Sequence, residues 1–150
     1  MVNFLRSSEK KSIIEELQKQ FGIANLPYLL IRGGKEKIRA FSGSLSKEEI
    51  EKLSEVLRIE LIGSYLLKNE HENEYRLSFD SCHMLKDQII KNIIELDEQQ
   101  FQHWIRGLDL DIKVERGTYI VRYKNDFLGC GKSNGEKLFN YVPKDRRLRK

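Results

Sequence analysis

The C-terminal end of the chain places aromatic side chains among basic ones. Phe139, Asn140 and Tyr141 are interleaved with seven cationic residues: Lys132, Lys137, Lys144, Arg146, Arg147, Arg149 and Lys150. Lysine and arginine neutralise phosphates and release bound counterions. Aromatic rings stack on unpaired bases, and an asparagine amide can read a base edge. The combination predicts an RNA-binding surface.

A simpler interpretation assigns the same residues to structure. Phe139, Tyr141 and Val142 would form the last strand of a barrel, and the neighbouring charges would merely be solvated. The two interpretations are compatible, because a strand can turn an apolar face inward and leave its cations outside.

Charge is distributed unevenly along the 150 residues. The net charge is +4. From Lys113 onward there are eleven lysines and arginines against four acidic residues, a net of +7, so the first 112 residues carry −3. Such asymmetry is typical of a chain whose basic end binds a polyanion, although a solubilising tail would look the same.

Residues 126–133, Asp-Phe-Leu-Gly-Cys-Gly-Lys-Ser, invite comparison with a phosphate-binding loop. That motif needs a glycine where Asp126 stands, and it must open a helix, for which Asn134-Gly135 and Pro143 leave little room. A dinucleotide fingerprint would need its third glycine at Asn134. We therefore predict no nucleotide cofactor, and interpret the stretch as a glycine-bent strand that another backbone approaches closely.

Histidine and cysteine offer no recognisable catalytic or metal-binding pattern. The spacings of His71, His83, His103, Cys82 and Cys130 match none of the usual zinc motifs. Nothing nearby orients a cysteine and a histidine as nucleophile and base. We predict no catalytic residue, no metal and no cofactor, and hence a chain that is not itself an enzyme.

The lengths of the hydrophobic runs indicate the cellular compartment of the protein. None approaches the length of a membrane span, and the N-terminus has no apolar signal-peptide core. Two cysteines are too few for a disulfide framework. These features predict a cytoplasmic protein that does not enter a membrane.

Hydrophobic periodicity and turn residues predict the elements that position these side chains. In the N-terminal half they are a helix over 8–21, a hairpin of strands 27–32 and 37–42, a helix from a capping box at Ser46 to about Arg58, and strands 59–68 and 75–79. Residues 80–91 contain no flexible linker and predict a closely docked junction between two units.

The C-terminal half has the spacing of a small, mostly antiparallel barrel. The predicted elements are a strand over 92–96, a helix capped by Asp97 that Gly107 ends, and strands 110–114, 118–124 and 127–131. In 118–124 alternate residues should face opposite sides of the sheet.

Several of these stretches resemble known families. Residues 104–110 and 127–132 resemble the PUA domain, an RNA-binding module named for pseudouridine synthases and archaeosine transglycosylases. Residues 62–65 and 75–79 resemble the end of the pre-PUA domain in the Nip-seven family of ribosome-biogenesis factors. The ending, residues 140–147, is similar to PUA-like domains associated with Nop-two/Sun RNA cytosine methyltransferases.

This resemblance implies an α+β fold in which an α/β pre-PUA-like domain, residues 1–85, is docked on a PUA-like β-pseudobarrel, residues 86–150. It implies a non-catalytic RNA-binding protein in rRNA maturation or ribosome biogenesis. The alternative is an RNA-targeting accessory subunit of an RNA cytosine-5 methyltransferase or another RNA-modification enzyme.

The implied partner is RNA, either ribosomal or tRNA-like, with a possible protein partner on the N-terminal domain. The resemblance places Arg106 and Gly107 at the helix-to-strand loop that PUA domains present to RNA, and Lys132 just after the glycine strand. The full predicted RNA-binding set is Arg106, Gly107, Arg122, Lys132, Lys137, Asn140, Lys144, Arg146, Arg147 and Arg149.

Overall fold

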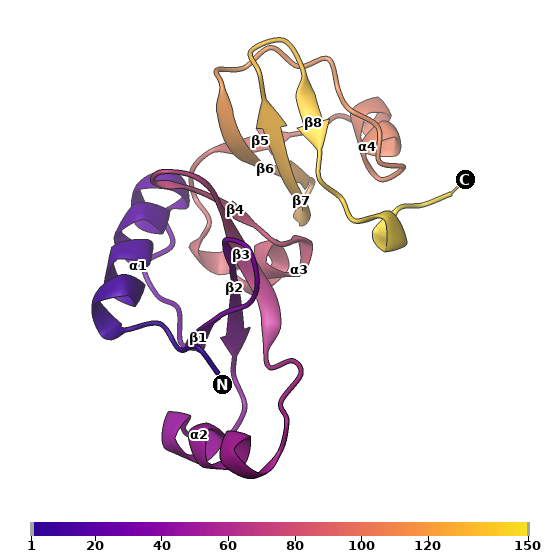
Figure 1. Ribbon diagram of the computed structural model, residues 1–150. Helices are drawn as coiled ribbons and strands as arrows, with labels where there is room; N and C mark the ends of the chain where they lie inside the picture. The colour runs from indigo at the N-terminus through magenta and orange to yellow at the C-terminus, as the bar shows by residue number, and fades with distance from the viewer. Residues whose placement is uncertain (1, 150) are drawn as a thin grey trace.

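A computed structural model describes residues 2–149 and contains two four-stranded sheets, one in each half of the chain (Figure 1). The predicted α+β class is confirmed. No helix within residues 2–149 is long and apolar enough to cross a bilayer.

The N-terminal sheet is antiparallel throughout, in the order β1-β2-β3-β4. Its strands are Leu29–Arg32, Lys37–Phe41, Ser64–His71 and Glu74–Leu77. Helix α1, Ser7–Phe21, contributes Ile13, Leu17 and Phe21 to the core that it shares with this sheet. Gly22, at φ 89°, ends the helix in the left-handed conformation. The predicted helix and hairpin are therefore confirmed.

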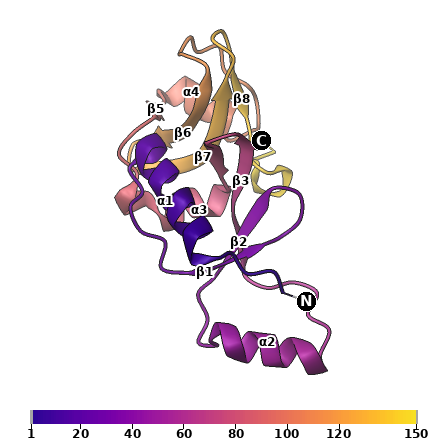
Figure 2. The same ribbon diagram turned by 60° about the vertical axis from the view of Figure 1, so that its left-hand side comes forward.

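Helix α2, Lys47–Val56, stands apart from both sheets (Figure 2). The predicted capping box is present, with the Ser46 hydroxyl accepting from the Glu49 amide at 3.1 Å. The only buried residue of the helix is Ile50. The strand predicted over 59–68 is wrong in its first half, because β3 begins at Ser64.

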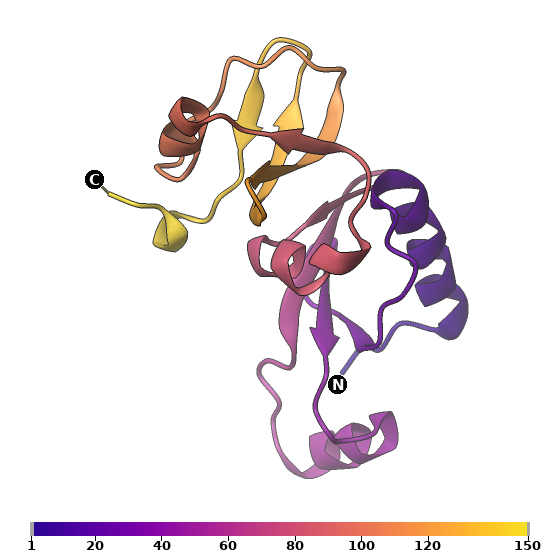
Figure 3. The same ribbon diagram turned by 180° about the vertical axis from the view of Figure 1, so that it is seen from behind.

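Residues 79–84 are helical, so the strand predicted over 75–79 ends two residues early, at Leu77. Ser78 accepts from the Ser81 amide at 3.1 Å and starts helix α3, Phe79–Met84. A short 3₁₀ turn, η1, follows at Lys86–Gln88. Helix α3 lies between the two sheets and contacts β7 (Figure 3).

The C-terminal sheet has the order β5-β6-β7-β8, with β5 parallel to β6 and the other pairs antiparallel. The strands are Ile93–Glu95, Gly117–Tyr123, Asp126–Ser133 and Leu138–Asn140. Helix α4, Glu98–Trp104, lies between β5 and β6 in the chain, and a 3₁₀ turn, η2, spans Lys144–Arg146. The strand predicted over 110–114 is wrong, because this segment keeps only an isolated bridge between Leu110 and Leu138.

The two halves share a core where they meet. Cys82 and Leu85 pack in the same cluster as Ile120 of β6 and Cys130 of β7. The cysteines are free thiols whose sulfur atoms lie 3.8 Å apart. The hydrogen bond with Cys130, together with burial, raises the pKa of the Cys82 thiol well above its usual value. The predicted close docking is confirmed, whereas the boundary between residues 85 and 86 stays a prediction.

Candidate nucleic-acid interface

The aromatic residues in and just after strand β8 lie away from the core. Leu138 is fully buried in the cluster around Trp104, whereas Phe139 is 38% and Tyr141 36% exposed. Lys132 of β7 is the register partner of Phe139, so the two side chains share one side of the sheet. Of the last strand predicted from Phe139, Tyr141 and Val142, only Phe139 lies in a strand, because β8 spans Leu138–Asn140. The residues that face the core are Leu138 and Val142.

The N-terminal sheet completes this surface. The Arg76 guanidinium lies 4.0 Å from the centre of the Tyr141 ring, a cation–π contact. His71 Nε2 lies 3.1 Å from Lys132 Nζ. We call the five residues His71, Arg76, Lys132, Phe139 and Tyr141 the inter-sheet face.

Two clefts flank the inter-sheet face, and each is lined by one of its aromatic rings. Tyr141, Arg76 and Arg146 line a cleft of about 190 Å³. Phe139, Lys132 and Arg116 line another, of about 290 Å³. Each cleft therefore offers a flat ring beside a cation, which suits a stacked base with its phosphate nearby.

Electrostatics at the first cleft are set by a partly buried ion pair. Arg76 Nε lies 2.5 Å from a carboxylate oxygen of Glu70, and both side chains are largely shielded from solvent. Burial raises the pKa of Tyr141, and the nearby Arg76 charge only partly opposes that rise. Tyr141 therefore keeps its phenolic proton at neutral pH and presents a neutral ring with a hydrogen-bond donor.

The tail brings part of the predicted set to the same cleft. Arg146 pairs with Asp80 at 2.9 Å and lies 5.5 Å from the Phe79 ring centre. Lys144 and Arg149 are exposed. Lys150, which belongs to the predicted basic tail, lies outside the residues that the structure describes.

Asn140 has a structural role. Its amide nitrogen donates to the carbonyl oxygens of Trp104 at 2.8 Å and Leu108 at 3.0 Å, and its amide oxygen accepts from the Val142 N–H at 2.8 Å. Both amide protons are thus engaged in fixing the last strand to the end of α4. A base contact by Asn140 would have to displace those bonds.

Two more predicted residues contact each other where the tail passes the loop after helix α4. Arg147 Nε donates to the Val142 carbonyl at 2.9 Å, and its side chain covers Gly107. Gly107 has φ 86°, a conformation that favours glycine, and an added Cβ there would collide with the Arg147 side chain. Gly107 and Arg147 therefore pack on each other.

The remaining predicted cations lie elsewhere. Arg106 Nη1 donates to the Gln102 carbonyl at 2.5 Å. Arg122 pairs with Glu95 on β5 and sits opposite Phe127, at the end of the sheet away from Lys132. Lys137 Nζ lies 3.8 Å from a carboxylate oxygen of Asp111. The structure therefore brings together Lys132 and, on the neighbouring cleft, Arg146, but not Arg106, Arg122 or Lys137.

Sequence reasoning missed the residues from the first half of the chain. His71 and Arg76 carry no local signal, because they reach the interface only through the docking of the two sheets. Arg116, which was also missed, directly precedes β6 in the C-terminal half and lines the cleft of Phe139. A cluster of cations from both sheets can be recognised only once β4 is known to contact β7.

Strand β7 contains the whole glycine-rich stretch, which is therefore a strand and not a phosphate-binding loop. Residues 126–133 are extended, and the next element is strand β8 rather than a helix. A Cβ added at Gly131 would lie 2.8 Å from both the Trp104 ring and the Leu138 side chain. The prediction of a glycine-bent strand with a close approach is confirmed, although the group that approaches is side chain rather than backbone.

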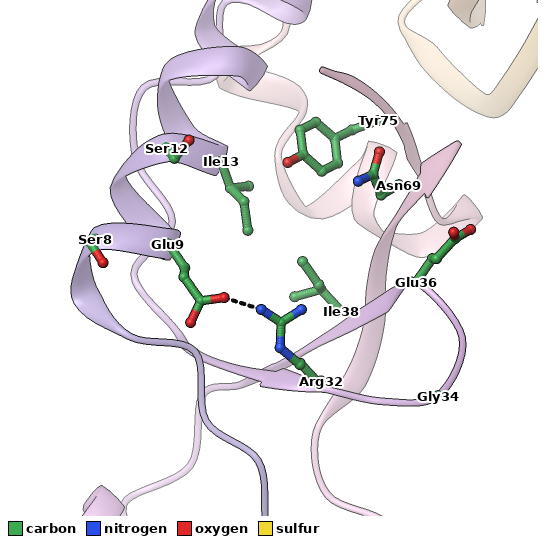
Figure 4. Close-up of a pocket in the computed structure, with 10 residues that line it drawn as sticks. All are labelled: Ser8, Glu9, Ser12, Ile13, Arg32, Gly34, Glu36, Ile38, Asn69 and Tyr75. Carbon is green, nitrogen blue, oxygen red and sulfur yellow. Dashed lines mark hydrogen bonds and ion pairs between the residues drawn. The ribbon is translucent and has the colours of Figure 1, made fainter. Parts of the chain in front are cut away.

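Another cleft lies between α1 and the β1–β2 hairpin and measures about 600 Å³ (Figure 4). Glu9 and Arg32 form an ion pair across its mouth. A hydrogen bond from the Arg6 amide is the main reason why the pKa of Glu9 is lowered. Its walls hold no cysteine or histidine. Within residues 2–149 no three histidine, cysteine or acidic side chains are grouped to hold a metal ion.

Comparison with known proteins finds a family match in the C-terminal half of the chain. Residues 91–148 match the family model described as the methyltransferase RsmF PUA domain. Over 146 residues the chain is 28% identical to the Ribosomal RNA small subunit methyltransferase F of Vibrio cholerae. This alignment covers 95% of this chain and 30% of the Vibrio cholerae protein. The proteins of the same name from Aeromonas salmonicida and Psychromonas ingrahamii are each 26% identical, covering 94% and 95% of this chain and 28% and 30% of their own length.

The chain thus spans about 30% of the length of these curated relatives. The match extends through both sheets, since 95% of the chain is aligned, while the family model covers β5 to η2. This match confirms the resemblance to PUA domains associated with RNA cytosine methyltransferases: residues 91–148 match the PUA domain of RsmF-type methyltransferases.

Proposed function

We propose that this chain is an RNA-targeting module that binds small-subunit ribosomal RNA on the inter-sheet face and thereby directs a ribosomal RNA cytosine-5 methyltransferase to its site. In this proposal the chain catalyses no step itself. The observation that carries the proposal is the exposed pair Phe139 and Tyr141, flanked by cations, on a PUA domain of the RsmF type.

The relatives favour a methyltransferase context over an independent biogenesis factor. They are named small-subunit ribosomal RNA methyltransferases, and they align with the N-terminal half of this chain as well as the PUA domain. An accessory role in RNA modification therefore has more support than the ribosome-biogenesis role that the sequence first suggested.

Unpaired RNA suits the inter-sheet face better than a duplex does. Aromatic rings stack only on bases that are not already stacked in a helix, and sequence-specific RNA recognition mostly uses loops, bulges and ends. Phe139 and Tyr141 line separate clefts, so each can take one base. Lys132 and Arg146 lie where they can neutralise the connecting phosphates.

The test is the affinity of the full chain for a loop-containing fragment of small-subunit ribosomal RNA. Phe139→Ala and Tyr141→Ala should each weaken binding by about fivefold to 150-fold, the range of about 1–3 kcal/mol for one stacked base. Ile90→Ala serves as the control, because Ile90 is also exposed but lies beside Gly22 at the end of α1, off the inter-sheet face. Unchanged affinity in both aromatic variants would contradict the proposal.

A second measurement concerns the target. RNA crosslinked to the chain in its native cells should be enriched in small-subunit ribosomal RNA, at positions near a methylated cytosine. If another RNA dominates the recovered fragments, small-subunit ribosomal RNA is not the target. RNA binding itself is tested by the affinity measurement.

A further inference from the structure

The segment around helix α2 exposes a concentration of aliphatic side chains. Eleven large hydrophobic residues are exposed within residues 2–149, and five of them fall between positions 45 and 61. They are Leu45, Leu53, Val56, Leu57 and Leu61. We call these five residues the α2 end. Single exposed apolar residues are ordinary, whereas a contiguous group of them marks an interaction surface.

Helical spacing gathers most of this group on one stripe. Ile50, Leu53 and Leu57 follow one another at intervals of three and four residues, with Val56 alongside. The stripe begins in the core, since Ile50 is fully buried, and runs outward until Val56 is 76% and Leu57 58% exposed. The helix is therefore anchored at one point and presents the rest of its apolar side to solvent.

Backbone anchoring keeps the α2 end in place. Arg39 of β2 donates through Nε to the carbonyl of Ile62 at 3.0 Å, and its Nη2 donates to the carbonyl of Gly63. Gly63 has φ 74°, and an added Cβ would lie 2.5 Å from the Ala40 carbonyl oxygen. The chain thus leaves α2 through a fixed contact with β2, so the exposed apolar residues of this segment are held out from the body.

Charge separates the α2 end from the RNA surface. Residues 47–60 contain five glutamates against three basic residues, whereas the segment from Lys113 onward has a net charge of +7. An apolar stripe bordered by carboxylates repels RNA phosphates. It fits instead a protein surface with an apolar depression and basic residues around it.

We propose that the α2 end docks on the catalytic domain of an RsmF-type methyltransferase. The proposal rests on the proposed function. The chain corresponds to only 30% of the length of its methyltransferase relatives, so most of each relative lies outside the matched region. The α2 end lies at the opposite end of the molecule from the sheet of β5–β8 (Figures 1 and 2). Docking there leaves the inter-sheet face free to hold RNA.

The experiment uses the full chain, tagged in its native cells and crosslinked through amines before purification. Lys47 and Lys52 of α2 should crosslink to the methyltransferase catalytic domain, on the same polypeptide or on another. Val56→Ser combined with Leu57→Ser should reduce those crosslinks about tenfold or more, as loss of an interface hot spot does. Both residues are highly exposed, so the variant should fold.

Leu108→Ser is the matched control, an exposed leucine away from the α2 end. Equal crosslinking of the double variant and the unaltered chain overturns the proposal, as do crosslinks from α2 to a second copy of the chain or to no methyltransferase. RNA affinity measured on the same preparations separates the two claims. If the unaltered chain binds RNA but forms no crosslink to a methyltransferase, only the docking proposal is refuted. If the unaltered chain does not bind RNA, the proposed function is refuted.

Discussion

The inter-sheet face and the α2 end expose apolar groups of different kinds. The first offers two aromatic rings next to arginine, lysine and histidine, and the second offers five aliphatic residues bordered by glutamates. A flat ring beside a cation suits a base and its phosphate, whereas aliphatic side chains suit another protein surface. The difference supports the proposal that the two surfaces serve two classes of partner.

The two regions also differ in how they are supported. The inter-sheet face rests on a sheet whose core contains the fully buried Trp104, with its indole N–H donating to the Leu128 carbonyl at 2.7 Å. Helix α2 itself rests on one buried side chain, Ile50, while Arg39 of β2 holds the segment that follows it. A rigid surface fixes the positions of bases, whereas a lightly anchored helix can adjust to a partner.

The largest expected effect comes from removing the support of the inter-sheet face. Trp104→Ala should lower the free energy of unfolding by about 3–5 kcal/mol, because a large aromatic side chain leaves a cavity. Val56→Ala at the α2 end should change it by less than about 0.5 kcal/mol, since that side chain is mostly exposed. Urea denaturation of both variants checks the contrast, and similar losses in the two would break it.

A smaller effect distinguishes the two regions by charge. Removing Lys132 and Lys144 by alanine substitution should reduce the slope of log affinity against log salt by about 0.7 to 1 for each cation. Alanine at Lys47 and Lys52 of α2 should leave that slope unchanged. RNA titrations at several salt concentrations measure both pairs, and an equal change in the α2 pair would show that RNA also touches that end.

The smallest effect concerns the thiol beneath the inter-sheet face. The pKa of Cys82 is raised in the folded chain above the value of 9.0 expected for an exposed thiol. Above about pH 9 the unfolded chain loses this proton while the folded chain keeps it, so stability should fall as pH rises. The slope is at most about 1.4 kcal/mol per pH unit for one proton.

Denaturation of the unaltered chain and of Cys82→Ala between pH 8 and pH 10 isolates this contribution from that of the tyrosines. The alanine variant should show the shallower decline. Identical pH dependence in the two proteins would mean that the thiol titrates equally in the folded and unfolded chains.

Elements set by local sequence were predictable. The first helix was expected over 8–21 and spans Ser7–Phe21, and the capping boxes at Ser46 and Asp97 both form. Hydrophobic period and caps act within a few residues, so they can be read from the chain alone. The segment 110–114 has the composition of a strand, yet only Leu110 finds a partner, because β8 offers it just one bridge.

The basic and aromatic character of the proposed RNA-binding surface could be predicted from the sequence, but the residues that form it could not. Basic and aromatic residues near the C-terminus indicated RNA, but which of them face outward depends on the register of β8 against β7. The amide of Asn140 reaches Trp104, 36 residues earlier in the chain. Arg76 reaches Tyr141 only because the two sheets dock. No pattern within the sequence encodes contacts at that range.

The most direct test of two separate surfaces is to map where RNA touches the chain. Photocrosslinking to a uridine-containing loop of small-subunit ribosomal RNA, followed by identification of the modified residues, should place the crosslinks at Phe139, Tyr141 or their neighbours on the inter-sheet face. Residues 45–61 should carry none. Crosslinks concentrated on that segment, or absent from β8 and its surroundings, would contradict the account.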